Sequence, residues 1–121
     1  MLFRSPWGEA AIKQFVREAL DETLKLESAL ARLRTATRIA VLHYAPIAGT
    51  VEGEPLEIYP FLGATRLSGP LDQLRPNLAV HGHAHRGSLR GTTRGGVTVF
   101  NVALPVLRRM EKPIGYLTID L

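Results

Sequence analysis

The chain contains no cysteine, so disulfide bonds and thiolate metal ligands are both excluded. No apolar run approaches the ~20 residues that cross a bilayer. The first six residues lack the apolar core and the cleavage site of a signal peptide. We therefore expect a soluble protein with no membrane partner, and the cytoplasm is the default location.

Aromatic residues are scarce, at 7% of the chain, and they do not interleave with the cations. Because bases stack on aromatic rings, a surface for single-stranded nucleic acid is poorly supported, although nucleic acid is not excluded as a partner. Acidic residues number 11 against 15 basic ones, which gives a net charge of +4 and a mild preference for anionic partners. Three arginines at four-residue steps, Arg86, Arg90 and Arg94, are candidates for a phosphate-attracting rim. Arg86 is the candidate for direct phosphate contact, because its guanidinium fork matches two oxygens.

What the chain does contain is typical of one small folded domain spanning residues 1–121, with 45% hydrophobic and 21% charged residues. Apolar residues from Ile12 to Leu33 recur at steps of four and three, with charged residues on the other faces. This spacing predicts one amphipathic helix over about residues 7–34, preceded by an N-terminal cap at Ser5 and Pro6.

Short apolar segments follow the predicted helix. The continuous apolar run in residues 38–43 is typical of a strand covered on both faces. Further strands are expected at about residues 78–81 and 97–102, and an alternating edge strand at 115–120. Glycine and proline predict a long loop over residues 47–70, then one helical turn at 71–74. The fold class is therefore α/β, with a long N-terminal helix followed by mixed β-strands.

Histidines cluster where two of these strands end. Three of the four lie at alternate positions, His81, His83 and His85, and the fourth, His43, closes the run 39–42. Neutral imidazole is a common metal ligand, and ligands collect at the carboxyl ends of strands in open α/β sheets. The pattern predicts a metal site made by His43, His83 and His85. His81 precedes the glycine turn and is not expected to be a ligand.

Two sequence patterns, His43-Tyr44-Ala45-Pro46 and Gly82-His83-Ala84-His85, each follow an apolar strand. They resemble the last two motifs of the calcineurin-like metallophosphoesterases, and the long helix ahead of them fits that family's layout. The resemblance implies that His43 and His83 hold one divalent metal ion and that His85 holds a second. It also implies hydrolysis of a phosphomonoester or phosphodiester at this two-metal centre. Imidazole accepts Mn, Fe, Zn, Ni and Co, so the metal is not specified.

The Asp and Asn motifs that the family carries upstream are absent from this sequence. The chain therefore resembles the C-terminal half of the family's α/β sandwich, and the partners implied are a missing N-terminal half or a second copy, besides the phosphate ester. Two alternatives stay open: a mononuclear zinc site made by the three histidines, and a non-catalytic module that binds a partner through its helix stripe or an unpaired sheet edge. A cupin-like barrel also carries His-x-His, but the residues after His85 lack the glutamate it needs.

Overall fold

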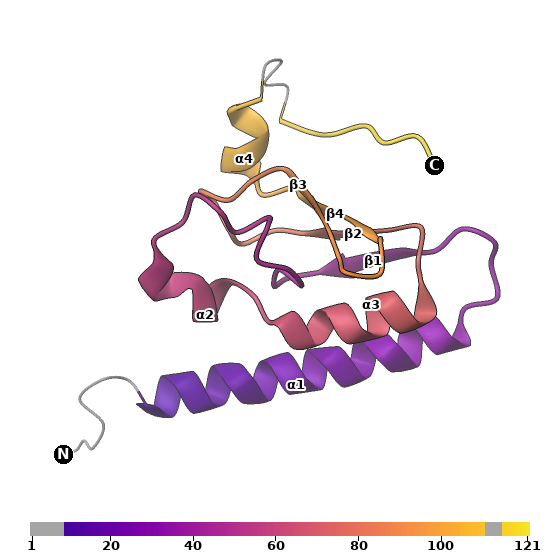
Figure 1. Cartoon of the computed structure of the whole chain (residues 1–121), viewed down its shortest axis with the longest axis horizontal. Helices are drawn as coiled ribbons and strands as arrows, with labels where there is room; N and C mark the ends of the chain where they lie inside the picture. Colours follow the sequence, from indigo (N-terminus) through magenta and orange to yellow (C-terminus); the bar gives the residue numbers. More distant parts are fainter. Residues whose placement is uncertain (1–8, 111–114) are drawn as a thin grey trace.

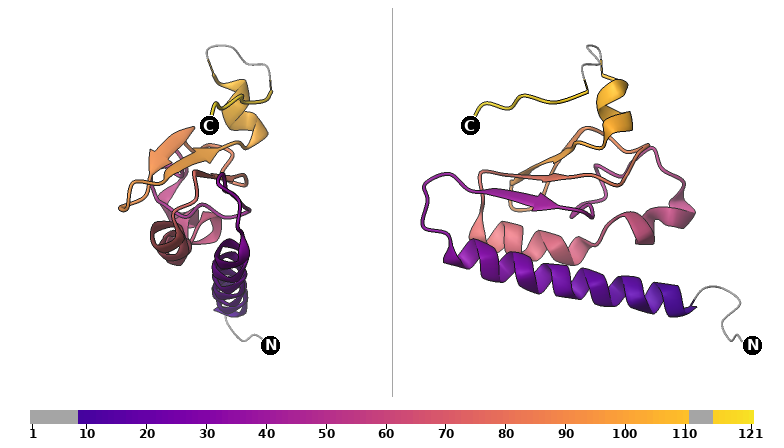
Figure 2. Two further views of the ribbon diagram at one scale, coloured as in Figure 1. Left: turned by 90° about the vertical axis from the view of Figure 1, so that its right-hand side faces the viewer. Right: turned by 180° about the vertical axis from the view of Figure 1, so that it is seen from behind.

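The structure is a computed structural model that describes residues 9–110 and 115–121. In chain order the elements are α1 (Glu9–Arg32), β1 (Ile39–Leu42), the 3-10 helix η1 (Leu56–Ile58), α2 (Tyr59–Leu62), the 3-10 helix η2 (Thr65–Leu67), α3 (Ser68–Leu74), β2 (Leu78–His81), β3 (Arg90–Thr92), β4 (Thr98–Asn101) and α4 (Leu104–Arg108). Helices α1 and α3 lie side by side on one side of the sheet, and α4 lies on the other (Figures 1 and 2). The predicted α/β class with a long N-terminal helix is confirmed. Within the described residues, no helix is both long and apolar enough to cross a membrane.

Helix α1 confirms the prediction for residues 7–34 from residue 9 to residue 32, while its predicted start and cap lie outside the described residues. Its apolar stripe is buried at Ala19, Leu26 and Leu30. Ile12 and Val16 belong to the same stripe but remain 42% and 44% exposed. The helix is thus anchored to the sheet mainly by its C-terminal half.

The sheet has the order β1-β2-β4-β3, in which β1, β2 and β4 are parallel and β3 is antiparallel to β4. The three parallel strands confirm the strands predicted at 38–43, 78–81 and 97–102. Strand β3 was not predicted, because its sequence, Arg-Gly-Thr, has no apolar pattern. Pairing of Gly91 with Val99 places it in the sheet through backbone hydrogen bonds, which depend little on side chains.

The main core lies between the sheet and the helices α1 and α3. Strand β1 directs Ala40 and Leu42 into it, beside Leu26 and Leu71. The prediction that this strand is covered on both faces is wrong: Ile39 and Val41 are 45% and 76% exposed. The physical reason is position, because β1 is the edge strand of the sheet.

The edge strand predicted at 115–120 is also wrong, since residues 115–121 form no strand. Strand β3 occupies the second side of β4, and the segment pairs with neither of the edge strands, β1 and β3. Tyr116 and Leu121 are accordingly 61% and 65% exposed.

The loop predicted at 47–70 carries three short helical pieces, η1, α2 and η2, and helix α3 then begins at Ser68, three residues before the predicted turn. Because it lacks an N–H, Pro105 is expected to stop the strand at 97–102; it also lies in the first turn of α4, where the missing N–H costs nothing. The charged residues at 108–113 favour a turn, and part of this segment lies outside the described residues.

Candidate functional site

Two of the predicted ligands lie beside each other. His43 directly follows β1, and His83 comes two residues after the end of β2. Because β1 and β2 are parallel neighbours, their carboxyl ends meet at the same end of the sheet. The two imidazole rings stand with centroids 4.6 Å apart and planes inclined at 34°. We call these two residues the histidine pair.

The ring of His83 is oriented by a backbone hydrogen bond. Its Nε2 lies 3.1 Å from the carbonyl oxygen of Phe61. A carbonyl can only accept, so Nε2 carries the proton and Nδ1 of the neutral ring keeps its lone pair. A metal-binding histidine commonly donates its second nitrogen to a carbonyl in this way, because that bond selects the tautomer.

The backbone of His83 is strained, with a φ of +69°. A β-carbon in this left-handed region costs about 1–2 kcal/mol. Such strain persists only where the surrounding structure enforces it, and it is concentrated at functional sites.

His85 does not join the histidine pair. It is exposed, and its backbone carbonyl accepts a hydrogen bond from Arg109 Nη1 at 2.8 Å. Across residues 9–110 and 115–121, no group of three or more His, Asp or Glu side chains is close enough together to hold a metal ion. The structure therefore brings together two of the three predicted ligands, His43 and His83. The third, His85, follows His83 by two residues in an exposed turn.

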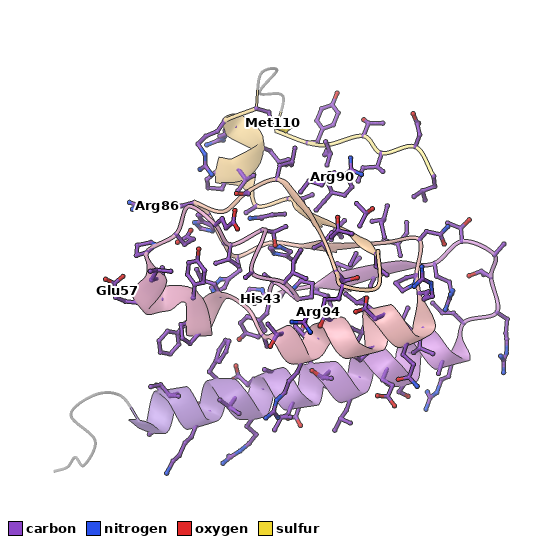
Figure 3. The ribbon with its side chains drawn as sticks, in the orientation of Figure 1. His43, Glu57, Arg86, Arg90, Arg94 and Met110 are labelled. Atoms are coloured by element: carbon purple, nitrogen blue, oxygen red, sulfur yellow. The ribbon has the colours of Figure 1, made fainter. Side chains whose placement is uncertain are left out.

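The predicted arginine rim does not form around the histidine pair. The Arg86 side chain points to the outside of the molecule, well away from His43 (Figure 3). Arg90 lies on β3, with its guanidinium 5.6 Å from the centroid of the Phe100 ring. Arg94 follows β3, in the turn that leads back into β4, which is the end of the sheet opposite to the histidines. Spacing by four gathers side chains only on a helix, and these residues are not helical.

His81 is 1% exposed, and both of its ring nitrogens are occupied. Nδ1 lies 2.8 Å from the carbonyl of Gly82, which can only accept, and Nε2 lies 2.7 Å from the hydroxyl oxygen of Thr50, which therefore donates. Burial lowers the pKa of His81, and the neighbouring His83 and His43 lower it further, against the hydrogen bond to Gly82. The neutral ring of His81 has no free lone pair. It therefore supports the site through its hydrogen bonds and does not coordinate a metal ion.

Asn101 joins the two loops that carry the site. Asn101 is fully buried at the end of β4. Its Nδ2 donates to the carbonyls of Thr50 at 3.2 Å and of Ala84 at 2.9 Å. Its Oδ1 accepts from the backbone N–H of Ala103 at 3.1 Å. Gly87 completes this contact, because a β-carbon there would come within 2.1 Å of the Thr50 carbonyl. From its place after an apolar strand, the sequence offers Asn101 either as a residue that supports a metal ligand or as an ordinary strand-end residue, and it gives no signal for Thr50.

Helix α1 supplies carboxylates beside the histidine pair. Glu22 Oε1 accepts from the backbone N–H of His43 at 3.2 Å, and Glu18 Oε2 accepts from the Tyr44 hydroxyl at 3.1 Å. Burial is the main cause that raises the pKa of Tyr44, and the hydrogen bond to Glu18 raises this pKa further. Glu18 and Glu22 lie four residues apart on one face of α1. The sequence does not indicate which residues this face contacts, because that depends on how α1 docks on the rest of the fold.

Next to the histidine pair lies an apolar cavity of about 390 Å³ between the N-terminal half of α1 and the α2 segment. Phe15 contributes to its wall and contacts the rings of Tyr44 and Phe61 edge-on, with centroids 4.8 Å and 5.8 Å away. The Tyr44 ring in turn contacts that of His43 at 4.8 Å. A chain of ring contacts from Phe15 through Tyr44 to His43 thus links the wall of the cavity to the histidine pair.

Comparison with protein-family models, with curated proteins and with solved structures finds no match to this chain. The function is therefore argued from the geometry of the histidine pair and its surroundings.

Proposed function

We propose that the chain contributes part of the metal centre of a phosphoesterase, which hydrolyses a phosphomonoester or phosphodiester. The observation that carries the proposal is the convergence of His43 and His83, whose ring centroids are 4.6 Å apart although 40 residues separate them in the sequence. The two motifs that resemble those of the calcineurin-like metallophosphoesterases contain these same two residues.

The donor set fits a divalent cation in its chemistry. His83 presents Nδ1 as its lone-pair nitrogen, because Nε2 donates to the Phe61 carbonyl. The carboxylates of Glu18 and Glu22 lie on the adjacent helix face and offset positive charge at the histidine pair. His85 is the remaining imidazole of the motif, and it joins the site if the exposed turn that carries it rearranges.

When bound, the metal ions supply an activated water and neutralise charge on the phosphoryl oxygens. The role proposed for the residues of this chain is to hold and orient these metal ions. Imidazoles carry no negative charge, so two dications at the usual 3.5–4 Å spacing need anionic ligands in addition. We propose that those ligands come from a further polypeptide segment that docks at the carboxyl end of the sheet.

The first prediction concerns metal binding. Titration of the purified chain with Mn²⁺ or Zn²⁺, followed by calorimetry, should give binding that His43→Ala and His83→Ala each weaken at least tenfold, because each removes one nitrogen ligand. The matched control is Glu27→Ala, which removes an exposed carboxylate elsewhere on α1.

Stoichiometry and activity then separate the alternatives. Two equivalents of metal support the two-metal centre, whereas one equivalent supports the mononuclear zinc site. Any hydrolysis of an aryl phosphodiester that the chain supports in the presence of Mn²⁺ should disappear in His83→Ala. Metal affinity and hydrolysis unchanged in that variant would refute the role assigned to the histidine pair.

A second candidate function, a partner-binding module, is favoured by one observation. Ile39 and Val41 are exposed on β1, whose outer backbone edge has no partner strand among the described residues. An exposed, apolar edge strand is a template for pairing with another chain.

A further inference from the structure

The apolar cavity that lies beside the histidine pair is not used by the proposed metal site. Its volume of about 390 Å³ is within the range of small-molecule sites. Six side chains form its two main walls. They are Ile12, Phe15 and Val16 from α1, and Tyr59, Pro60 and Phe61 from the α2 segment.

The lining is almost entirely apolar. Among the described residues that line the cavity, Arg66 is the only charged one. Apolar surface of this kind favours an alkyl or aryl group, and Arg66 is the one cation in the described lining that could contact an anion. Exposed apolar side chains on α1, at Ile12 and Val16, are therefore explained as walls of a binding site.

The cavity adjoins the histidine pair at Phe61. The side chain of Phe61 lines the cavity, and its backbone carbonyl accepts the hydrogen bond from His83 Nε2. Ala45, which also lines the cavity, is two residues after His43. A molecule bound at both places would put a phosphoryl group at the histidines and an apolar group between α1 and α2.

We propose that this cavity binds the apolar group of the ester, so that the substrate class is a phosphate ester of an alkyl or aryl alcohol. The inference rests on the proposed function for the phosphoryl half of the ligand only. Burial of each methylene group contributes about 0.8 kcal/mol, which corresponds to an affinity gain of about fourfold. The cavity therefore predicts a specific dependence of affinity on chain length.

The test uses n-alkylphosphonates from two to eight carbons, which are not hydrolysed, and measures their dissociation constants for the whole chain with and without Mn²⁺. Affinity should rise about three- to fourfold per methylene until the cavity is filled. Val16→Trp, which places an indole in the cavity, should flatten this dependence. Leu24→Trp is the matched control, because Leu24 is 65% exposed on the same helix and does not line the cavity.

The outcomes for the cavity and for the metal site are separable. Equal affinity across the series, or a chain-length dependence that Val16→Trp leaves unchanged, overturns the inference even if Mn²⁺ strengthens binding of every phosphonate. Chain-length dependence without any effect of Mn²⁺ supports the apolar cavity and counts against the proposed metal centre. A thermal melt of each Trp variant shows whether the fold is kept.

Discussion

At the scale of single residues, His83 combines three features that ordinary surface histidines lack. Its φ is positive, its Nε2 donates to the Phe61 carbonyl, and its ring lies against that of His43. The backbone strain works against folding, whereas the ring contacts place a lone pair beside a second imidazole. A β-carbon at this left-handed position lowers stability, so the imidazole has a cost that a glycine there would avoid.

Replacement of His83 by glycine should therefore stabilise the metal-free protein relative to replacement by alanine. We expect His83→Gly to have a free energy of unfolding about 1 kcal/mol higher than His83→Ala, since only glycine adopts this φ without strain. Urea denaturation in the presence of a chelator measures the difference, and both variants should lose metal binding.

His85 provides the control for this prediction, because its φ is not positive. There the order should reverse, with His85→Ala more stable than His85→Gly by about 0.4–1 kcal/mol. The same order at both positions would show that the backbone of His83 is not strained in solution.

At the scale of elements, the site depends on loops that Asn101 holds together. The end of β4 contacts the loop after β2 through Ala84 and the long loop after β1 through Thr50. These loops are remote from one another in sequence, and buried hydrogen bonds to backbone carbonyls give them a single relative position. The rigidity of the histidine loop thus arises from a neighbouring strand.

Asn101→Asp should be strongly destabilising, although it barely changes the size of the side chain. It replaces the donor Nδ2 with an acceptor facing two buried carbonyls, and each lost bond to a buried group costs about 1–3 kcal/mol. We expect the free energy of unfolding to fall by about 3 kcal/mol, measured by urea denaturation at neutral pH.

Asn77→Asp is the matched control for this substitution. Asn77 is exposed, and its Oδ1 accepts from the Arg38 backbone N–H at 2.8 Å, a bond that a carboxylate can also make. Its stability should stay within about 0.5 kcal/mol of the original protein. A similar loss in both variants would mean that the amide donors of Asn101 contribute little.

At the scale of the whole molecule, the sheet is covered unequally. Helices α1 and α3 bury one face of β1 through Ala40 and Leu42, whereas Val41 is 76% exposed on the other. Beyond β1 no further strand continues the sheet within the described residues. This edge is where an additional strand, from a second copy or from another polypeptide, extends the sheet with the least rearrangement.

We expect the chain to self-associate through this edge at high concentration. Sedimentation equilibrium should show a weight-average mass that rises with protein concentration, and Val41→Lys should restore the monomer because a charged side chain blocks edge pairing. Leu24→Lys is the control, since it places the same charge on an exposed position of α1. A monomer at every concentration, or association unaffected by Val41→Lys, would contradict this role of β1.

The sequence by itself determined the elements with strong local periodicity. The step of three and four predicted α1, and the apolar runs predicted β1, β2 and β4, because these patterns reflect which side of an element is buried. The runs at β1 and β2 also lead into His43 and, through a glycine turn, into His83, so the sequence alone predicts that these two histidines lie at the same end of the sheet. The local pattern predicts these elements because the face of a helix or strand on which a residue lies determines whether that residue is buried.

Only the tertiary structure decided features that depend on neighbours. Strand β3 forms by pairing with β4, whereas residues 115–121 pair with neither edge of the sheet, although their sequence alternates. His85 and His83 share a motif, yet a left-handed backbone at His83 and a turn after it separate their rings. Thr50 and Glu22 reach the site through packing, which leaves no pattern in the sequence, since contacts between distant segments are set by the assembled core and not by spacing along the chain.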